Sequence, residues 1–245
     1  MFLDPNNPVE IRRLEIENLG NQDEVLEIFF DFEPSFSKKM EEYSHPAFNK
    51  LFMRIKKDGE NLIFEKRERS LKGAGYIATS LYTENEQIVD FEYEIDREKY
   101  LGRENIGIPN GVKLSGSLSK EIYDLTDPII AIKRVIKIRP KEVASVNFIV
   151  STSRNEAEAI KNLENMKSEE EIIRIMNIIR VRAEEEAKYL QVNAYKIGIY
   201  MEYYKYFLSK INEKENYNFS GMISDLWKYG ISGDNPILLV KINSI

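Results

Sequence analysis

Near the end of the chain, a tight polar turn places a carboxylate directly before an apolar segment. The stretch ISGDNPILLVKI spans residues 231–242 and includes Ser232, Gly233 and Asp234. A carboxylate can accept hydrogen bonds from two neighbouring sugar hydroxyls, and a turn before a helix presents it to a ligand. The Asn–Pro pair that follows is also a typical helix start, since Asn caps free amides and Pro fits the first helical position. Asp234 is therefore expected either to contact a sugar or to help cap this helix.

Two arginines provide a second set of candidate ligands. Arg97 and Arg103 lie in the stretch DREKYLGR, residues 96–103. A guanidinium can bind phosphate or sugar oxygens through two parallel hydrogen bonds. The alternative is an arginine that is solvated or paired with a carboxylate, and the residue pattern alone leaves both open.

The histidine and cysteine content excludes several kinds of catalytic site. The chain has one His, His45, and no Cys. Chemistry that needs two His residues is therefore excluded, and so are thiolate zinc sites and disulfide scaffolds. This removes an active aldose-epimerase-type sandwich, because that reaction uses a pair of His residues with a carboxylate.

Composition describes an ordinary globular protein. The 245 residues are 42% hydrophobic and 31% charged, and the net charge of −6 argues against a nucleic-acid partner. No apolar run is long enough to span a membrane, and the N-terminus MFLDPNNP does not resemble a signal peptide. These features predict a cytoplasmic location.

The first 153 residues alternate apolar and charged side chains with the period of a β-strand. The patterned stretches lie at 9–20, 23–34, 51–70, 75–83, 87–96 and 128–153. They predict an antiparallel sheet with one solvent-exposed face. Two long irregular segments, 33–52 and 96–128, interrupt the strands, and loops of this size are often functional.

The pattern becomes helical after Ser153. Ser153 and Ser168 are each followed three residues later by Glu, which predicts two capped helices. A further helix is expected over 193–211. The segment after Pro236 is apolar almost all round, so it must be enclosed by other elements. We therefore expect the chain to be a piece of a larger protein.

Four short motifs together resemble a known family. They are HPAFNKLF (45–52), DREKYLGR (96–103), LSGS (114–117) with DPI (127–129), and LWKYGISGDNPILLVKI (226–242). In this order they resemble the N-terminal region of glycoside hydrolase family 94, in the branch of cyclic β-1,2-glucan synthases and β-1,2-oligoglucan phosphorylases. The resemblance covers about residues 10–242.

The resemblance implies a β-rich fold with helices: a partial galactose-mutarotase-like antiparallel β-sandwich, then linker helices, then the first helix of an (α/α)6 barrel. It divides the chain into a carbohydrate-binding-like sandwich at 1–153, a helical linker at 154–225 and the start of a truncated catalytic barrel at 226–245. The barrel would continue in the same polypeptide.

Members of this family cleave β-glucosidic bonds with inorganic phosphate and invert the anomeric centre. The resemblance implies phosphate as co-substrate, a β-glucan oligosaccharide as partner and no metal or organic cofactor. It places the general acid and most phosphate ligands beyond Ile245, so the chain alone is expected to be inactive. Homodimers are common in the family, and a membrane synthase is an alternative parent to a cytoplasmic phosphorylase.

The resemblance also assigns substrate-binding residues. It places the turn of Ser232, Gly233 and Asp234 near the sugar-binding end of the active site. His45 and Phe48 would wall the sugar pocket or a subunit contact, and the alternative for both is a structural loop anchor. The rival interpretation of the whole chain is a non-catalytic carbohydrate-binding or assembly module.

Overall fold

The computed structural model describes residues 1–37, 39–67, 74–102, 107–113, 117–212 and 227–231. The chain forms two compact units, Met1–Ile179 and Arg180–Ile245. The first unit holds all the strands described below.

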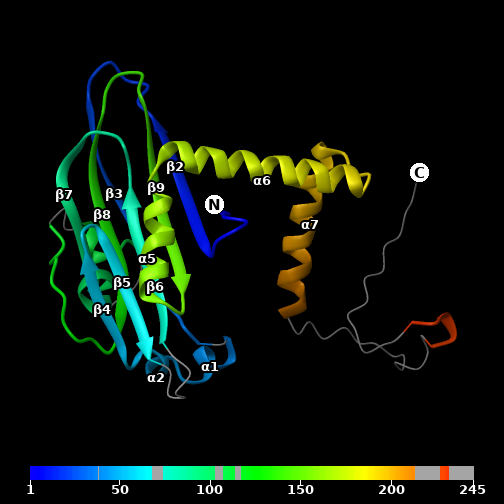
Figure 1. The fold of residues 1–245 in the computed structure, drawn as a ribbon, viewed down its shortest axis with the longest axis horizontal. Helices are drawn as coiled ribbons and strands as arrows, with labels where there is room; N and C mark the ends of the chain where they lie inside the picture. The colour runs from blue at the N-terminus through cyan, green and yellow to red at the C-terminus, as the bar shows by residue number, and fades with distance from the viewer. Residues whose placement is uncertain (38, 68–73, 103–106, 114–116, 213–226, 232–245) are drawn as a thin grey trace. The chain divides into compact units, whose positions relative to one another are not determined.

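In the part of the chain that the structure describes, nine strands form two antiparallel sheets (Figure 1). They are β1 (Phe2–Leu3), β2 (Val9–Glu17), β3 (Glu24–Phe32), β4 (Met53–Asp58), β5 (Asn61–Arg67), β6 (Ala74–Tyr82), β7 (Gln87–Asp96), β8 (Pro128–Ile138) and β9 (Val143–Ser153). One sheet has the order β1-β2-β9-β6-β5-β4 and the other β3-β8-β7. The predicted β-rich antiparallel sandwich is confirmed, because every patterned stretch forms a strand.

The main core lies between the two sheets. Alternate residues of each strand point inward, and four isoleucines of β8 are fully buried there: Ile130, Ile132, Ile136 and Ile138. Phe148 of β9 stacks on Phe30 of β3 with ring centroids 3.4 Å apart, so it joins the two sheets directly. Burial of these apolar side chains is the main source of the sandwich's stability.

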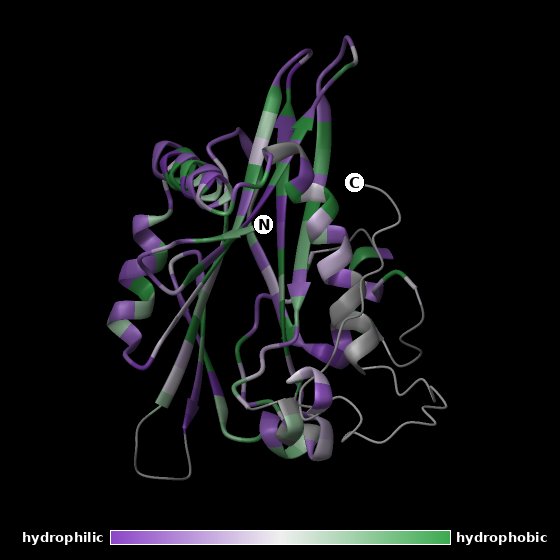
Figure 2. Ribbon diagram, turned by 90° about the vertical axis from the view of Figure 1, so that its right-hand side faces the viewer, coloured by the Kyte–Doolittle hydropathy of each residue, from purple (hydrophilic) through white to green (hydrophobic). Residues whose placement is uncertain are grey.

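Helices cover the other face of the six-stranded sheet. Residues of β2, β5, β6 and β9 pack there against α5 (Glu156–Asn165) and α6 (Glu169–Tyr189). The prediction of one solvent-exposed face is wrong for this sheet, because Ile11, Ile63 and Ile149 point outward and need a cover. Figure 2 shows apolar and polar residues alternating along the strands and helices of this unit.

The two predicted helix caps have different outcomes. Ser168 caps α6 as predicted, since its Oγ accepts a hydrogen bond from the Glu171 amide at 3.4 Å. The cap predicted at Ser153 is wrong. Asn155 caps α5 by accepting from the amide of Glu158 at 3.1 Å, and the Ser153 hydroxyl bonds the Glu158 carboxylate at 2.6 Å. An Asx side chain at this position reaches the amides of the first turn directly.

The two long irregular segments contain short helices. The first includes α1 (Lys39–Ser44) and α2 (Pro46–Lys50), and the second includes α3 (Arg97–Leu101) and α4 (Asn110–Lys113). Tyr100 and Leu118 of the second segment pack on Ile129 and Ala131 of β8. The second segment therefore covers the outer face of the three-stranded sheet.

The second unit contains α7 (Ala194–Asn212), which confirms the helix predicted over 193–211. The helix expected after Pro236 lies outside the described residues. Within the residues that the structure describes, no helix is long and apolar enough to cross a membrane. The domain boundaries at 153 and 225 stay predictions.

Candidate functional site

His45 and Phe48 lie at α2, in the first long segment. His45 occupies the N-cap position and makes no side-chain hydrogen bond to the helix. Its side chain is exposed, and the Phe48 ring is 44% exposed. Their predicted contact with a sugar or a second subunit stays a prediction.

Arg97 begins α3 and is paired with two carboxylates. Its Nε donates to Glu33 Oε1 at 2.7 Å, and its guanidinium lies 3.9 Å from Asp127 Oδ2. Its backbone amide also donates to the Asp127 carbonyl at 3.3 Å. The structure thus shows the ion-paired alternative for this arginine, and a contact with phosphate or sugar oxygens stays a prediction.

Lys50 joins the same two carboxylates from the end of α2. Its Nζ lies 2.7 Å from Glu33 Oε2 and 2.6 Å from Asp127 Oδ1, and its side chain is only 11% exposed. We call the group of Glu33, Lys50, Arg97 and Asp127 the Lys50 junction. It ties both long segments to the ends of β3 and β8, because Glu33 follows β3 and Asp127 precedes β8.

The charges of the Lys50 junction stabilise one another. Burial alone would raise the pKa of Glu33, but hydrogen bonds from Lys50 and Arg97 outweigh it and lower this pKa below its ordinary value. Burial would likewise lower the pKa of Lys50, and hydrogen bonds to Asp127 and Glu33 raise it instead. Glu33, Lys50 and Arg97 are therefore held in their charged forms near neutral pH.

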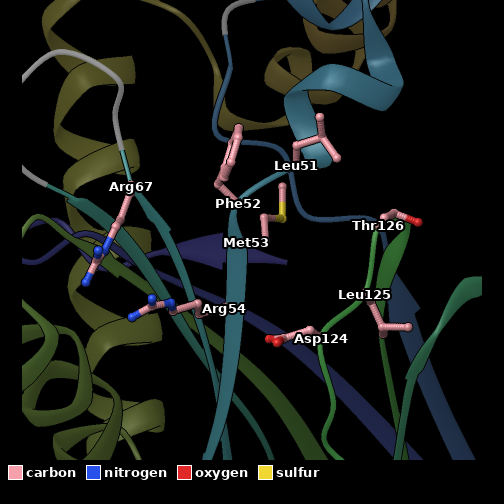
Figure 3. Close-up of a pocket in the computed structure, with 8 residues that line it drawn as sticks. All are labelled: Leu51, Phe52, Met53, Arg54, Arg67, Asp124, Leu125 and Thr126. Atoms are coloured by element: carbon pink, nitrogen blue, oxygen red, sulfur yellow. The ribbon is translucent and has the colours of Figure 1, made fainter.

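The structure has a cavity of about 500 Å³ (Figure 3), and two of its lining residues, Leu51 and Thr126, are chain neighbours of Lys50 and Asp127. We call it the edge pocket, because β4 is an edge strand of its sheet. Its lining residues are Leu51, Phe52, Met53, Arg54, Arg67, Asp124, Leu125 and Thr126. Leu51 follows Lys50 and Thr126 precedes Asp127, so the 2.6 Å ion pair between Lys50 and Asp127 holds both walls of the pocket.

The polar side chains of the edge pocket come from both walls. Arg54 of β4 lies opposite Glu65 of β5. Arg67 is two positions after Glu65 on the same strand, so Arg54 and Arg67 are on one face of the two neighbouring strands. Asp124 comes from the segment before β8, and Figure 3 shows its carboxylate on the other side of β4 from the guanidiniums of Arg54 and Arg67. Arg67 lies 3.7 Å from Glu65. Among the described residues, Arg54 and Asp124 have no ion-pair partner.

Phe52 has an unusual backbone conformation at the rim of the edge pocket. Its φ is 66°, in the left-handed region that non-glycine residues rarely adopt. Its ring is 63% exposed, so packing in the core does not account for the strain. Strain of this kind often accompanies a functional role, which the sequence pattern had not indicated.

The described carboxyls whose pKa values are shifted are hydrogen-bond acceptors. Every carboxyl group with a shifted pKa in the described part of the chain has that pKa lowered: Glu33, Glu60, Glu164, Glu169 and Glu171. A general acid needs a raised pKa instead. In the same residues, no group of three His or acidic side chains could hold a metal ion. The arrangement suits binding more than proton transfer.

Four of the predicted site residues lie outside the described residues. They are Arg103, Ser232, Gly233 and Asp234. Their predicted contacts with substrate stay predictions.

Comparison with known proteins identifies the family. Residues 1–169 match the family described as glycosyl hydrolase 94, supersandwich domain. The chain belongs to the glycosyl hydrolase 94 family. The matched region includes both sheets and α5, and the family match confirms the resemblance found in the sequence motifs.

A curated relative of this glycosyl hydrolase 94 chain is the cyclic β-(1,2)-glucan synthase NdvB of Rhizobium meliloti (strain 1021). The two are 24% identical over 248 residues, and the alignment covers 96% of this chain. It covers 9% of the relative, so the chain spans about a tenth of that protein's length.

The glycosyl hydrolase 94 motifs meet in space. HPAFNKLF supplies Lys50, DREKYLGR supplies Arg97 and DPI supplies Asp127, so three separate motifs converge on the Lys50 junction. Sequence reasoning missed Arg54 and Asp124, because isolated charges beside a strand look like an ordinary solvated surface. The one sequence feature that pointed to the edge pocket was the apolar pair Leu51–Phe52 at the end of the first motif.

Proposed function

We propose that this glycosyl hydrolase 94 chain is part of an enzyme that acts on β-1,2-linked glucans. The observation that carries the proposal is the family match over residues 1–169. The alignment with a cyclic β-(1,2)-glucan synthase over 96% of the chain supports this choice of linkage.

The reaction proposed is inverting phosphorolysis. An oxygen of inorganic phosphate attacks the anomeric carbon of the terminal glucose and forms a new C–O bond. The glycosidic C–O bond breaks, and a general acid gives its proton to the departing oxygen. The products are α-glucose 1-phosphate and a glucan shortened by one unit. Phosphate is the nucleophile, so a second catalytic carboxylate is not required.

In this proposal the chain supports catalysis without performing it. The shifted carboxyls of the described residues have lowered pKa values and accept hydrogen bonds from cations or amides, so they are poor proton donors. The family resemblance places the general acid in a helical barrel outside residues 1–245. The sandwich would then supply a rigid support and a surface for the glucan.

The proposal is tested with the polypeptide encoded by the complete reading frame that contains this chain. It is incubated with β-1,2-glucan and inorganic phosphate, and glucose 1-phosphate is measured with a coupled assay. Parallel reactions use β-1,3- and β-1,4-linked glucans. Release of glucose 1-phosphate from the β-1,2-glucan alone is expected. Release only from another linkage would contradict the choice of substrate.

A second candidate function is a non-catalytic carbohydrate-binding or assembly module. The edge pocket favours it, because its exposed polar groups and its aromatic rim suit binding. An edge-pocket variant of the complete polypeptide separates the two. Loss of glucan binding with no phosphorolysis in either protein would favour the module.

A further inference from the structure

We propose that the edge pocket binds a neutral saccharide through Phe52, Arg54 and Asp124. The sugar is identified as a glucosyl residue of a β-1,2-glucan only by the proposed function. The class of ligand, a neutral polyhydroxylated ring, rests on the pocket itself.

The edge pocket has one unpaired cation and one unpaired anion among its described lining residues. Arg54 and Arg67 are positive and Asp124 is negative, but Arg67 lies 3.7 Å from Glu65, which is outside the lining. A site for phosphate or another anion gathers an excess of cations. A balanced set of donors and acceptors instead suits a ligand that carries hydroxyl groups and no net charge.

The polar groups are available to a ligand. Arg54 and Asp124 are exposed, and among the described residues neither forms an ion pair. A ligand that binds Arg54 and Asp124 therefore does not have to break an ion pair within the described residues. The Asp124 carboxylate can accept bonds from two adjacent hydroxyls, and Arg54 can donate to hydroxyl or ring oxygens. The two side chains lie on opposite sides of β4, so a saccharide that contacts both lies across this edge strand.

The apolar groups provide a surface for a sugar ring. Leu51 and Leu125 are half-buried and Met53 is buried, while the Phe52 ring is 63% exposed beside them. An aromatic face packs well against the C–H groups of a pyranose, which accounts for a large apolar side chain held in a strained, exposed position. The cavity of about 500 Å³ is within the ordinary range for ligand sites, roughly 300–1,000 Å³.

The pocket is pre-formed by its neighbours. Lys50 and Asp127 bridge the two walls at 2.6 Å, and Leu125 packs against the main core. A pocket whose walls are already fixed loses little conformational entropy when a ligand binds.

The experiment is an NMR titration of the full 245-residue chain with a short β-1,2-linked glucooligosaccharide. Two pocket variants are Asp124→Asn, which keeps the shape but removes the charge, and Phe52→Gly, which removes the ring. Asp58→Asn is the matched control, because Asp58 is an exposed carboxylate at the far end of β4. Phe52→Tyr is the conservative control that keeps a ring.

We expect changes in the amide chemical shifts around residues 51–54 and 124–126. Asp124→Asn should weaken binding about tenfold, since one hydrogen bond to a charged group is worth about a factor of ten. Phe52→Gly should also weaken binding, because it removes the ring that packs on the sugar. Asp58→Asn and Phe52→Tyr should bind as the parent chain does. Thermal melts of each variant show that it is folded.

The ligand panel also includes β-1,4-linked glucooligosaccharide, glucose 1-phosphate and inorganic phosphate. Pocket-dependent binding of the β-1,4-linked sugar alone would support the site and contradict the proposed linkage. Glucan binding that the pocket variants do not change would overturn the site and leave the proposed function standing. Tighter binding of phosphate or glucose 1-phosphate than of the glucan, or no saccharide binding at all, would also overturn it.

Discussion

At the residue scale, Phe52 combines a strained backbone with an exposed ring. Its φ of 66° places it where a Cβ atom is unfavourable, by about 1–2 kcal/mol per residue. The ring is mostly exposed, so its removal costs little buried area. Strain and poor packing together make this position informative about function.

Two substitutions of Phe52 separate the effect of backbone strain on stability from the effect of losing the ring. Phe52→Gly should raise the free energy of unfolding by about 1 kcal/mol, because Gly adopts positive φ without a penalty. Phe52→Ala removes the same ring but keeps the strain, so it should not gain stability. Urea unfolding measures both variants. Equal stability for Gly and Ala would show that the backbone is not strained.

Arg134 is the second informative residue, because it points into the core between the sheets. It is 1% exposed, donates Nε to the Leu81 carbonyl at 3.0 Å and pairs with both carboxylate oxygens of Glu60. Arg134 lowers the pKa of Glu60 through these hydrogen bonds. A buried guanidinium that loses its carboxylate is costly.

Removal of the Glu60 charge should therefore destabilise the sandwich. Glu60→Gln is expected to lower the free energy of unfolding by about 2 kcal/mol, below the full value for a buried pair because Glu60 is half exposed. Glu86→Gln is the control, because Glu86 pairs with the exposed Arg139 at 3.4 Å. Urea unfolding should show almost no change for the control. Equal effects of the two substitutions would contradict a special role for the Arg134 pair.

At the element scale, the Lys50 junction connects the two long segments to the sandwich. Lys50 and Asp127 are 77 positions apart in the chain, and Lys50 and Glu33 are 17 apart. The junction should therefore control the order of both segments and the shape of the edge pocket between them.

Lys50→Met tests the junction. The side chain is nearly buried while its partners are about half exposed, so the expected loss is about 1–2 kcal/mol at neutral pH. The variant should also weaken saccharide binding at the edge pocket. Lys57→Met on the same edge strand is the control, because it forms no ion pair among the described residues. Unchanged stability of Lys50→Met would contradict the structural role of the junction.

The junction also predicts a pH dependence. The pKa of Glu33 is lowered from its ordinary value of 4.5, so its stabilising effect is present above that pH and is lost as the pH falls through the lower, folded-state value. Lys50→Met removes one of the two cations that lower this pKa. The variant should therefore lose less stability than the parent chain on acidification. Parallel curves of unfolding free energy against pH would contradict this.

The elements themselves were largely predictable from the sequence, and their contacts were not. A period of two is visible in β3, where Leu26, Ile28, Phe30 and Phe32 recur at every second position. Ser168 likewise marks the start of α6 locally. The helices that cover Ile11 and Ile149 were not expected on the outer face of the six-stranded sheet. The apolar residues of this face alternate with charged ones in the sequence, so the pattern does not show that they form a second core. Arg97 was singled out from its motif, but its partners Glu33 and Asp127 lie far away in sequence.

At the scale of the whole molecule, two antiparallel sheets and α5 lie in the region that matches the glycosyl hydrolase 94 supersandwich domain. The sandwich carries its own candidate pocket at the edge strand β4, beside a junction built from three family motifs. Its carboxyl groups with lowered pKa values stay ionised, and ionised carboxylates suit structural ion pairs and ligand binding. In the proposed function, the chemistry is performed by residues outside 1–245.

The release of glucose 1-phosphate from β-1,2-glucan and inorganic phosphate tests most directly the proposal that the sandwich supports catalysis and does not perform it. It is measured in parallel for the 245-residue chain and for the polypeptide encoded by the complete reading frame that contains it. We predict release by the complete polypeptide and none by residues 1–245 alone. Release of glucose 1-phosphate by the 245-residue chain itself would contradict the view that the sandwich supports catalysis without performing it.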